Sequence, residues 1–247
     1  MEAWVVGGTS GIGAAVVEAL KDRGVRALIM SEDVDAGPRY HERSQHFELL
    51  DLAAPLERVG SRAQQLLEQY GLPIYLFVSA GLTREIAAID TSEADWMLLA
   101  HVNLLGIAQL CNTVARAWRD DPQDEWQRHI VILGSANAMR PLPSQGAYSV
   151  MKAGLHAYAK CLSNDVAASR VRVNVVVPGA IWTPMNEPLF PDNPSDPGRR
   201  RVAESALAGR WGDAKEVAAV AVWTALDSPS FLMGTEVTVD GGFLAKR

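Results

Sequence analysis

Short apolar runs alternate with longer amphipathic segments along the whole 247-residue chain. The runs are rich in Val, Ile and Leu, as in strands that are covered on both faces; they span residues 3–6, 27–30, 46–49, 74–79, 129–133, 171–177 and 236–239. The segments with an apolar stripe at helical spacing span residues 12–23, 56–70, 93–118, 146–168 and 214–226. This alternation requires parallel strands joined by right-handed crossovers. The sequence therefore predicts a doubly wound α/β fold with about seven strands and helices on both faces of the sheet.

No internal repeat, low-complexity tract or linker divides the chain, so residues 1–247 are expected to form one domain. Two segments interrupt the alternation. Residues 31–46 contain Gly37-Pro38 and no helical stripe, which predicts a loop or one irregular turn. Residues 184–210 contain five prolines, at 184, 188, 191, 194 and 197, and then a short helical pattern at 199–207. Because they follow the carboxyl end of a strand, they are expected to form a substrate lid.

Composition excludes several classes of function. The net charge is −6 and the pI is about 5.4, which leaves no basic surface for nucleic acid or an anionic membrane. No apolar run reaches the roughly 18 residues that a membrane span needs, and the first residues do not have the pattern of a secretory leader. Cys111 and Cys161 fall in apolar helical patterns, which predicts small core residues in a reducing compartment. We therefore expect a cytoplasmic protein.

A metal centre is not expected. The five histidines show no spacing typical of metal ligands; they are His41, His46, His101, His129 and His156.

A glycine-rich turn follows the first predicted strand and precedes an amphipathic helix. It reads Gly7-Gly8-Thr9-Ser10-Gly11-Ile12-Gly13. Gly7, Gly11 and Gly13 allow a tight turn and a close approach of the backbone to a pyrophosphate, and the helix start offers N–H groups and a positive dipole end. A plain tight turn is the alternative reading. The position between strand and helix favours a dinucleotide site in a Rossmann-type fold.

Tyr148 and Lys152 are spaced Tyr-x-x-x-Lys, which places them one turn apart on one face of the predicted helix. A nearby ammonium lowers the pKa of a phenol. A shift of about three units from a pKa near 10 would bring Tyr148 close to neutral pH, where it could exchange a proton with an alcohol or carbonyl oxygen. The hydroxyl of Ser135 could hold that oxygen. The alternative reading of Tyr148 is an aromatic side chain packed on a helix.

The glycine loop, followed in order by Ser135, Tyr148 and Lys152, resembles the short-chain dehydrogenase/reductase family along nearly the whole chain. Further elements resemble the family in the expected order; they are Asp51-Leu52, Ala80-Gly81, Asn103, Pro178-Gly179, Ile181 and Thr183. The resemblance implies that Asp51 and Leu52 contact adenine. It also implies that the residues after Pro178-Gly179 hold the nicotinamide carboxamide.

The resemblance also implies a role for each catalytic residue. Tyr148 would be the general acid/base and Ser135 would orient the substrate oxygen. Lys152 would bind the nicotinamide ribose and lower the pKa of Tyr148. Asn103 would hold a water that links Lys152 to solvent, and its alternative reading is a polar helix residue bonded to a neighbouring backbone group.

Three positions depart from the family pattern. Val6 replaces a common Thr before the glycines, Val78-Ser79 replaces two asparagines, and Gly134 replaces the first of two common serines. None of the three removes a group that carries out chemistry.

The choice between NAD and NADP depends on the end of the second strand. An acidic residue there binds the ribose 2′-OH and repels a 2′-phosphate. Family spacing places Ser31 at this position, followed by Glu32, and no Lys or Arg occurs at 9, 10, 31 or 32. NAD is therefore favoured. NADP stays open, because a serine could lie beneath a 2′-phosphate and Arg39 or Arg43 could fold back.

The substrate pocket is expected between the serine and the tyrosine and under the lid. Its expected residues, which suggest apolar walls, are Ala136, Asn137, Met139, Pro141, Pro143, Trp182 and Met185. Ordinary packing is the alternative for Trp182. The basic cluster Arg199-Arg200-Arg201 indicates either a solvated helix face or recognition of an anionic substrate or a carrier's phosphate.

The predicted function is an NAD(P)-dependent oxidoreductase that interconverts a secondary alcohol and a ketone. Dihydrodiol dehydrogenases and 3-oxoacyl reductases are the groups it resembles. A cofactor-binding sensor without turnover, and an isomerase or dehydratase using the same tetrad, are the alternatives. Relatives commonly pair the helices expected at 93–118 and 146–168 and make a second contact through 231–244, so we expect a homotetramer, with a dimer as second choice.

Overall fold

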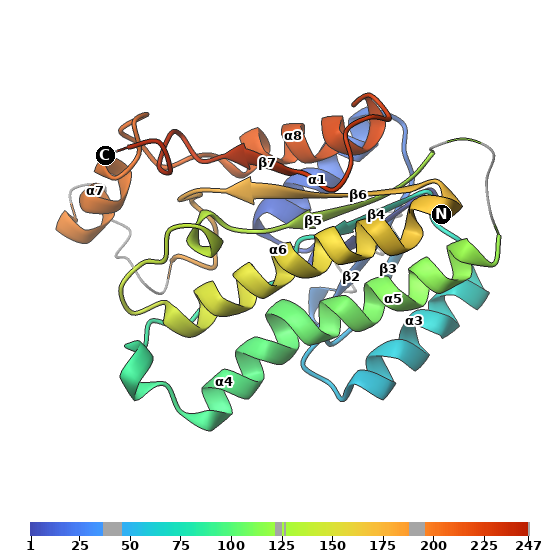
Figure 1. Cartoon of the computed structure of the whole chain (residues 1–247), viewed down its shortest axis with the longest axis horizontal. Coiled ribbons are helices and arrows are strands. Elements are labelled where there is room, and N and C mark those ends of the chain that lie inside the picture. The colour runs from blue at the N-terminus through green and yellow to red at the C-terminus, as the bar shows by residue number, and fades with distance from the viewer. Residues whose placement is uncertain (37–45, 122–124, 126, 188–195, 247) are drawn as a thin grey trace.

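A computed structural model describes residues 1–36, 46–121, 125, 127–187 and 196–246. In this part of the chain one sheet of parallel strands runs in the order β3-β2-β1-β4-β5-β6-β7 (Figure 1). The strands are β1 (Ala3–Val6), β2 (Ala27–Ser31), β3 (His46–Leu49), β4 (Tyr75–Val78), β5 (Arg128–Leu133), β6 (Val171–Pro178) and β7 (Glu236–Val239). The predicted doubly wound, Rossmann-type fold is confirmed.

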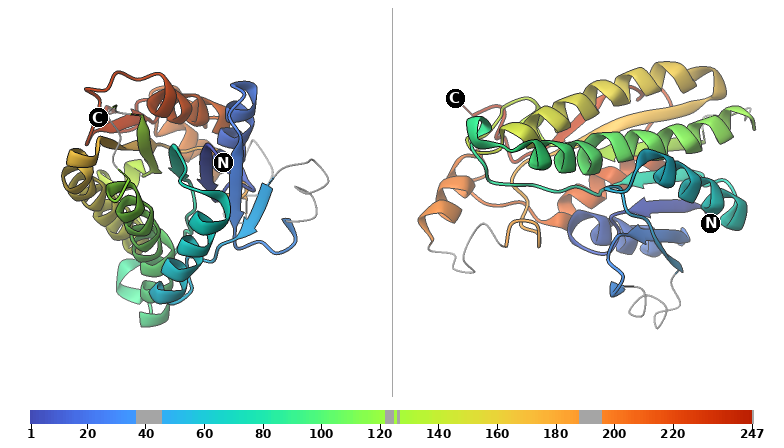
Figure 2. Two further views of the ribbon diagram at one scale, coloured as in Figure 1. Left: turned by 90° about the vertical axis from the view of Figure 1, so that its right-hand side faces the viewer. Right: turned by 90° about the horizontal axis from the view of Figure 1, so that it is seen from below.

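Helices cover both faces of the sheet, as the views in Figure 2 show. One layer contains α1 (Gly11–Asp22) and α8 (Ala214–Leu226), and the other contains α3 (Leu56–Tyr70), α5 (Gly106–Arg119) and α6 (Gly146–Val166). Successive strand residues supply the two layers alternately, since Trp4 packs in one core and Val5 in the other. The short helix α7 (Pro197–Glu204) lies away from both layers, beside the carboxyl end of the sheet (Figure 1).

The helix expected over 93–118 is interrupted. It divides into α4 (Glu93–Ala100), a π-helical turn at His101–Leu105, and α5. Gly106 follows the turn, and a Cβ there would lie 2.4 Å from the carbonyl oxygen of Leu52. The turn therefore brings the start of α5 against the loop after β3, and it places Asn103 in a π-bulge, a feature often found at functional sites.

Among the described residues, one helical segment, Glu93–Arg119, is long and apolar enough to span a membrane by length and composition alone. The core helix of a globular protein meets the same criteria. Ile107, Leu110 and Val114 are fully buried against the sheet and its neighbouring helices, so we interpret the segment as a core helix.

Cys111 is buried as predicted, but Cys161 is exposed on α6, so the prediction that both cysteines are core residues is wrong for Cys161. Most of the loop predicted at 31–46, and residues 188–195 of the expected lid, lie outside the described residues.

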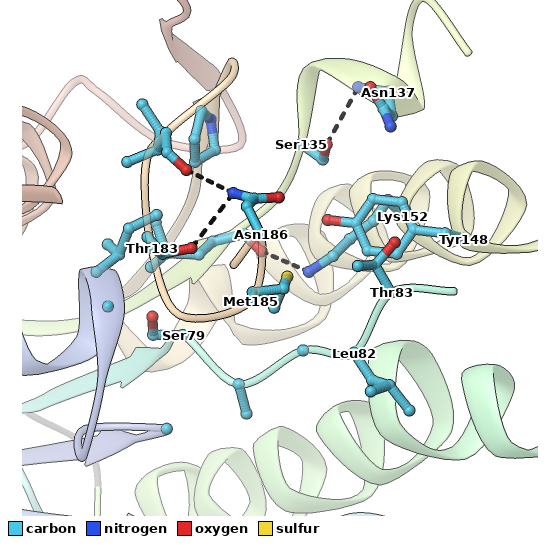
Figure 3. Close-up of a pocket in the computed structure, with 18 of the residues that line it drawn as sticks. Ser79, Leu82, Thr83, Ser135, Asn137, Tyr148, Lys152, Thr183, Met185 and Asn186 are labelled. Atoms are coloured by element: carbon cyan, nitrogen blue, oxygen red, sulfur yellow. Dashed lines mark hydrogen bonds between the residues drawn. The ribbon is translucent and has the colours of Figure 1, made fainter. Parts of the chain in front are cut away.

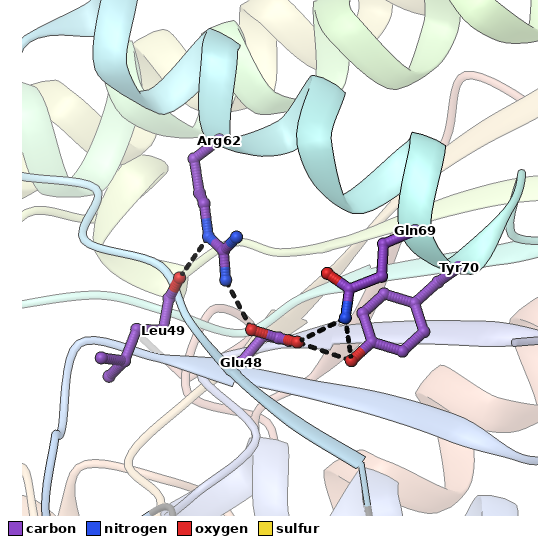
Figure 4. A network of polar contacts seen from close by, with 5 residues as sticks. All are labelled: Glu48, Leu49, Arg62, Gln69 and Tyr70. Carbon is purple, nitrogen blue, oxygen red and sulfur yellow. Dashed lines mark hydrogen bonds and ion pairs between the residues drawn. The ribbon is translucent and has the colours of Figure 1, made fainter.

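The edge strand β3 is tied to α3 by a polar network around Glu48 (Figure 4). The Arg62 guanidinium lies 2.5 Å from the Glu48 carboxylate and also donates to the carbonyl oxygen of Leu49 at 3.1 Å. The Tyr70 hydroxyl donates to Glu48 at 2.5 Å. Burial and this hydrogen bond raise the pKa of Tyr70 to about 12. The network stabilises β3 at the edge of the sheet, next to the carboxyl end of β2.

Candidate active site

A cavity of about 660 Å³ opens where the carboxyl ends of the central strands meet. Most of the residues predicted from the sequence line it, although they come from distant parts of the chain. They are Gly7, Thr9, Ser10, Gly11, Ile12, Ser31, Asp51, Leu52, Ala80, Gly81, Ser135, Ala136, Asn137, Tyr148, Lys152, Pro178, Gly179, Ile181, Thr183 and Met185. The fold thus brings the predicted cofactor and catalytic residues to a single site.

The glycine loop is packed so closely that side chains do not fit in it. A Cβ on Gly7 (φ +75°) would lie 2.6 Å from the backbone nitrogen of Ala80, and a Cβ on Gly13 would lie 2.0 Å from the carbonyl oxygen of Gly7. The helix α1 starts here with Ser10 as N-cap, without a side-chain capping bond and without an acidic residue in its first turn. Because these N–H groups have no side-chain cap, the site fits a pyrophosphate.

The end of β2 lines the cavity next to the glycine loop. Ser31 is buried, and its Oγ accepts hydrogen bonds from the Thr9 hydroxyl and from the Asp33 N–H, both at 3.1 Å. Glu32 lines the cavity beside it. Asp51 accepts the Ala53 N–H at 2.8 Å and stands at the same edge of the cavity. Arg39 and Arg43 lie outside the described residues.

Ser135 and Lys152 are each held by a backbone contact (Figure 3). Ser135 follows β5 and caps the 3-10 helix Ala136–Ala138, and its Oγ accepts the Asn137 N–H at 3.1 Å. Lys152 is 3% exposed, and its Nζ donates to the carbonyl oxygen of Leu133 at 3.0 Å. The same Nζ lies 5.8 Å from the centre of the Tyr148 ring. The contacts place the serine, the phenol and the ammonium around the same end of β5.

The pKa of Tyr148 departs from the prediction made from spacing alone. Burial raises it, and a side-chain hydrogen bond with Ser135 acts in the opposite direction. Burial also lowers the pKa of Lys152 to about 8. The predicted lowering of the Tyr148 pKa is therefore not found in this structure, because burial of the phenol dominates and raises the pKa. The Lys152 ammonium donates to Leu133 and lies 5.8 Å from the centre of the ring.

Asn103 is fully buried and is not among the described residues that line the cavity. Its Oδ1 accepts the Leu82 N–H at 3.0 Å, while its Nδ2 donates to the carbonyl oxygens of Leu82 and Leu99 at 2.9 and 3.1 Å. A Cβ on Gly81 would lie 3.2 Å from Asn103 Oδ1 and 3.5 Å from Lys152 Nζ, so Asn103 is close to the lysine. The contacts correspond to the alternative reading, in which the side-chain amide holds neighbouring backbone groups.

Asn186 stabilises the loop after β6 and was not predicted. Its Nδ2 donates to the carbonyl oxygen of Ile181 at 2.6 Å and to Thr183 Oγ1 at 3.4 Å (Figure 3). Thr183 lies against the glycine loop, since a Cβ on Gly11 would be 3.3 Å from it. Asn186 thereby holds the loop after β6 in its position against the glycine loop. A lone Asn in a proline-rich segment gives no spacing signal, so sequence reasoning could not find it.

Four of the predicted substrate residues lie outside the cavity lining in the described part of the chain; they are Met139, Pro141, Pro143 and Trp182. Pro141 and Pro143 are exposed to solvent. Met139 is exposed to solvent. Trp182 packs with its ring 3.6 Å from the Arg199 guanidinium and edge-on to Trp211 at 5.3 Å. Trp211 itself lines the cavity. The structure therefore corresponds to the packing alternative for Trp182, because Arg199 of α7 stacks on its ring.

The three consecutive arginines of α7 have different surroundings. Arg199 stacks on Trp182, Arg200 lies 3.5 Å from Glu204 one turn along α7, and Arg201 lines the cavity. The prediction treated the three as one cluster, whereas α7 turns only the third toward the site.

Other lining residues belong to no motif, and most come from loops. They are Leu82, Thr83, Leu142, Gln145, Ser205, Trp211 and Phe243, together with Val202 of α7. Gln145 directly precedes α6, and its side-chain oxygen accepts a hydrogen bond from Asn137. Its position at the start of the tyrosine-bearing helix is the only signal that could have indicated it. Within the described residues, no group of three or more His, Cys, Asp or Glu side chains could hold a metal ion.

A family model described as Enoyl-(Acyl carrier protein) reductase matches residues 6–244. The chain belongs to the short-chain dehydrogenase/reductase family. The resemblance inferred from the motifs is confirmed, and membership assigns the chain to oxidoreductases that use a nicotinamide cofactor.

Family members from distant organisms match nearly the whole chain. It is 28% identical over 246 residues to 3-oxoacyl-[acyl-carrier-protein] reductase FabG of Chlamydia trachomatis, covering 96% of this chain and 95% of that protein. It is 31% identical over 239 residues to Carbonyl reductase family member 4 of Xenopus tropicalis, with the same coverage of 96% and 95%. A crystal structure described as ribose-5-phosphate isomerase from Brucella melitensis 16M superposes with a TM-score of 0.87 at 27% identity, covering 98% and 92% of the two chains.

Proposed function

We propose that this protein is an NAD(P)-dependent oxidoreductase that interconverts a secondary alcohol and a ketone. The observation that carries the proposal is the convergence of Ser135, Tyr148 and Lys152 on one cavity with the glycine loop. A glycine-lined cradle and an uncapped helix start fit the pyrophosphate of the cofactor. The cavity places a proton-carrying phenol beside that cradle, as hydride chemistry requires.

The residues of the chain have separate tasks in this mechanism. When bound, the nicotinamide supplies or accepts the hydride. Tyr148 gives a proton to the substrate oxygen in reduction and takes it back in oxidation, and the Ser135 hydroxyl orients that oxygen. Lys152 would bind the ribose hydroxyls of the cofactor, and its ammonium lies 5.8 Å from the centre of the Tyr148 ring. Asn103 holds the loop at Gly81 near Lys152, and a water linked to Lys152 completes a proton path to solvent.

We propose NAD as the favoured cofactor. Glu32 places a carboxylate in the cavity next to Ser31, and a negative charge there repels a 2′-phosphate. Among the described lining residues, only Lys152 and Arg201 are cationic, and neither belongs to the β2 end. NADP is the alternative cofactor.

We propose a ketone with an apolar chain or ring as substrate. The printed activity of the Chlamydia relative makes a 3-oxoacyl thioester the first candidate, and a cyclic diol of the dihydrodiol type is the second. Leu82, Leu142 and Phe243 provide apolar walls, and Met185 closes the cavity at the lid expected over 184–210. Arg201 favours substrates that carry an anionic group away from the reacting carbon.

We propose a cytoplasmic homotetramer, with a dimer as alternative. Met97 on α4 and Val150 on α6 are about half exposed, and Phe231 in the segment before β7 is 96% exposed. Apolar side chains at these positions support contacts along the central helices and through residues 231–244. Light scattering that shows a monomer at micromolar concentration would contradict both assemblies.

Cofactor consumption tests the function. The assay uses NADH and NADPH with 3-oxoacyl thioesters and cyclic ketones, and NAD and NADP with the matching alcohols and diols. Each substrate is paired with an analogue that differs only in a distal carboxylate or phosphate, which tests Arg201. Tight cofactor binding without turnover on any member would favour a sensor. Product formation without net cofactor consumption would favour an isomerase or dehydratase.

A further inference from the structure

The catalytic face of α6 extends beyond Tyr148 and Lys152. Residues 148, 152, 156 and 160 are spaced by four and share one face of the helix. His156 is the next residue on this face after the lysine and is 5% exposed. It does not line the cavity in the described part of the chain, and the proposed mechanism gives it no task.

Two side chains of this face hold the end of β5. Lys152 Nζ donates to the carbonyl oxygen of Leu133 at 3.0 Å. The backbone N–H of Ser135 donates to His156 Nε2 at 3.2 Å. The two contacts lie on either side of residue 134, so α6 holds the backbone directly at the serine that orients the substrate oxygen.

Residue 134 must be glycine for this contact to form. A Cβ at Gly134 would lie 2.1 Å from His156 Nε2 and 2.7 Å from a methyl carbon of Val175. These distances are far below any van der Waals contact, and the imidazole occupies the space that a serine here would need. The glycine that departs from the family pattern at position 134 therefore leaves room for the imidazole of His156.

The second nitrogen of the imidazole faces an ion pair. His156 Nδ1 lies 3.5 Å from Glu236 at the start of β7, and the other carboxylate oxygen of Glu236 lies 2.6 Å from Lys160 Nζ. Because Nε2 accepts the N–H of Ser135, the proton of the neutral ring lies on Nδ1, toward Glu236.

We propose that His156 is a positioning residue for Ser135: its neutral, Nδ1-protonated ring fixes the backbone at the serine and ties it through Glu236 to β7. This inference rests on the proposed function, because Ser135 is taken to orient the substrate oxygen. It adds a residue that acts through the serine without touching the substrate.

Protonation of His156 breaks the contact, since Nε2 then carries a proton that faces the N–H of Ser135. The charged groups around the ring are Glu236 from β7 and Lys152 and Lys160 from α6. Burial lowers the pKa of His156, Glu236 raises it, and the lysines lower it. The ring thus stays neutral at neutral pH, and activity is expected to fall only below the usual histidine pKa of about 6.5.

The test compares the pH dependence of kcat in wild type, His156→Gln and His156→Leu. Glutamine offers an acceptor that does not titrate, so the acid limb of the profile is expected to disappear. Leucine removes the acceptor, and kcat is expected to fall about tenfold at neutral pH, with cofactor KM unchanged. Glu236→Gln is expected to move the acid limb to lower pH. An acid limb that is the same in wild type and His156→Gln, or a wild-type kcat in His156→Leu, would overturn the inference.

His129→Gln is the matched control, because His129 is also buried but lies at the opposite end of β5, bonded to Asn174. Its pH profile is expected to match that of wild type. Gly134→Ala is expected to expel the imidazole and to lower kcat as much as His156→Leu does. Gly134→Ala combined with His156→Ala is expected to be no worse than Gly134→Ala alone or His156→Ala alone. Losses in kcat that simply add would overturn the proposed pairing.

Nitrogen NMR of the histidine side chains separates the two proposals. In the resting protein, an unprotonated Nε2 and a protonated Nδ1 at neutral pH support the inference without any turnover. A protonated Nε2 overturns it, whatever the activity. If wild type consumes neither cofactor with any substrate, the proposed function fails, while the NMR result still decides whether His156 binds Ser135.

Discussion

The two halves of the cavity are built in opposite ways. In the half that contains the glycine loop, which we call the cofactor half after its proposed role, Gly7 lines the cavity and Gly13 packs against it, and a side chain on either glycine would collide with neighbouring backbone. In the half that we call the substrate half, Ser135, Tyr148 and Lys152 contribute polar side-chain atoms that are held by specific partners. Adding atoms should therefore damage the cofactor half, whereas removing atoms should damage the substrate half.

The largest effect is expected in the substrate half, from the loss of one oxygen atom. Tyr148→Phe removes the group that exchanges the proton, and kcat should fall by about 100-fold to 10,000-fold. Cofactor affinity should change little. Steady-state kinetics and cofactor titration measure the two quantities. Tyr158→Phe is the matched control, because this hydroxyl on the same helix bonds only to Ala108 and Asn112. A Tyr148→Phe enzyme with wild-type kcat would contradict the proposal that Tyr148 exchanges the proton.

The cofactor half should fail when an atom is added. Gly13→Ala places a methyl group 2.0 Å from the carbonyl oxygen of Gly7, so the loop must shift away from its position. Cofactor Kd should rise by about tenfold or more, since overpacking of this kind costs about 1–3 kcal/mol. Calorimetric titration of the folded variant measures it. Gly154→Ala is the control, because its nearest neighbour is the flexible end of Leu104. Unchanged Kd in Gly13→Ala would contradict the close packing.

A smaller effect is expected at the edge of the cofactor half, where a side chain, that of Glu32, lines the cavity. Glu32→Gln removes a negative charge from the cavity, and the ratio of kcat/KM for NADP to that for NAD should rise about threefold to tenfold. The rise should shrink at high salt. Asp35→Asn is the control, since Asp35 is a nearby acid outside the described lining. A ratio that is the same in Glu32→Gln and wild type would remove Glu32 from cofactor selection.

The smallest effect is expected outside the cavity, at the network of Figure 4. Glu48→Gln weakens the contacts with Arg62 and Tyr70, which are partly exposed, so the free energy of unfolding should fall by no more than about 1 kcal/mol. Denaturant unfolding measures this change, and kcat should stay at the wild-type value. Glu68→Gln serves as an exposed control. A loss of cofactor binding in Glu48→Gln would mean that the cofactor half extends to β3.

The fold and the location of the site were predictable because they depend on local patterns. Apolar periodicity predicted each strand within about two residues at either end, since a strand buried on both faces leaves a continuous apolar run. The glycine loop was predictable because the close approach at Gly7 and Gly13 excludes every other residue type. The spacing of Tyr148 and Lys152 indicated a shared helix face.

Other features depend on contacts between distant segments. The π-helical turn at Asn103 forms where α5 meets the loop at Leu52. Trp182 lies outside the cavity because Arg199 and Trp211 cover its ring. Neither contact leaves a periodic signal in the sequence, so only the folded chain shows them.

Apolar periodicity, glycine positions and residue spacing are local properties, so the sequence was enough to predict the fold class, the glycine loop and the residues that we propose for the site. The environment of those side chains depends on how distant segments pack against one another. Burial reverses the expected direction of the Tyr148 pKa, and the pairing of Gly134 with His156 becomes visible only when α6 packs against β5. Desolvation and side-chain contact are properties of the packed molecule, and no single segment contains them.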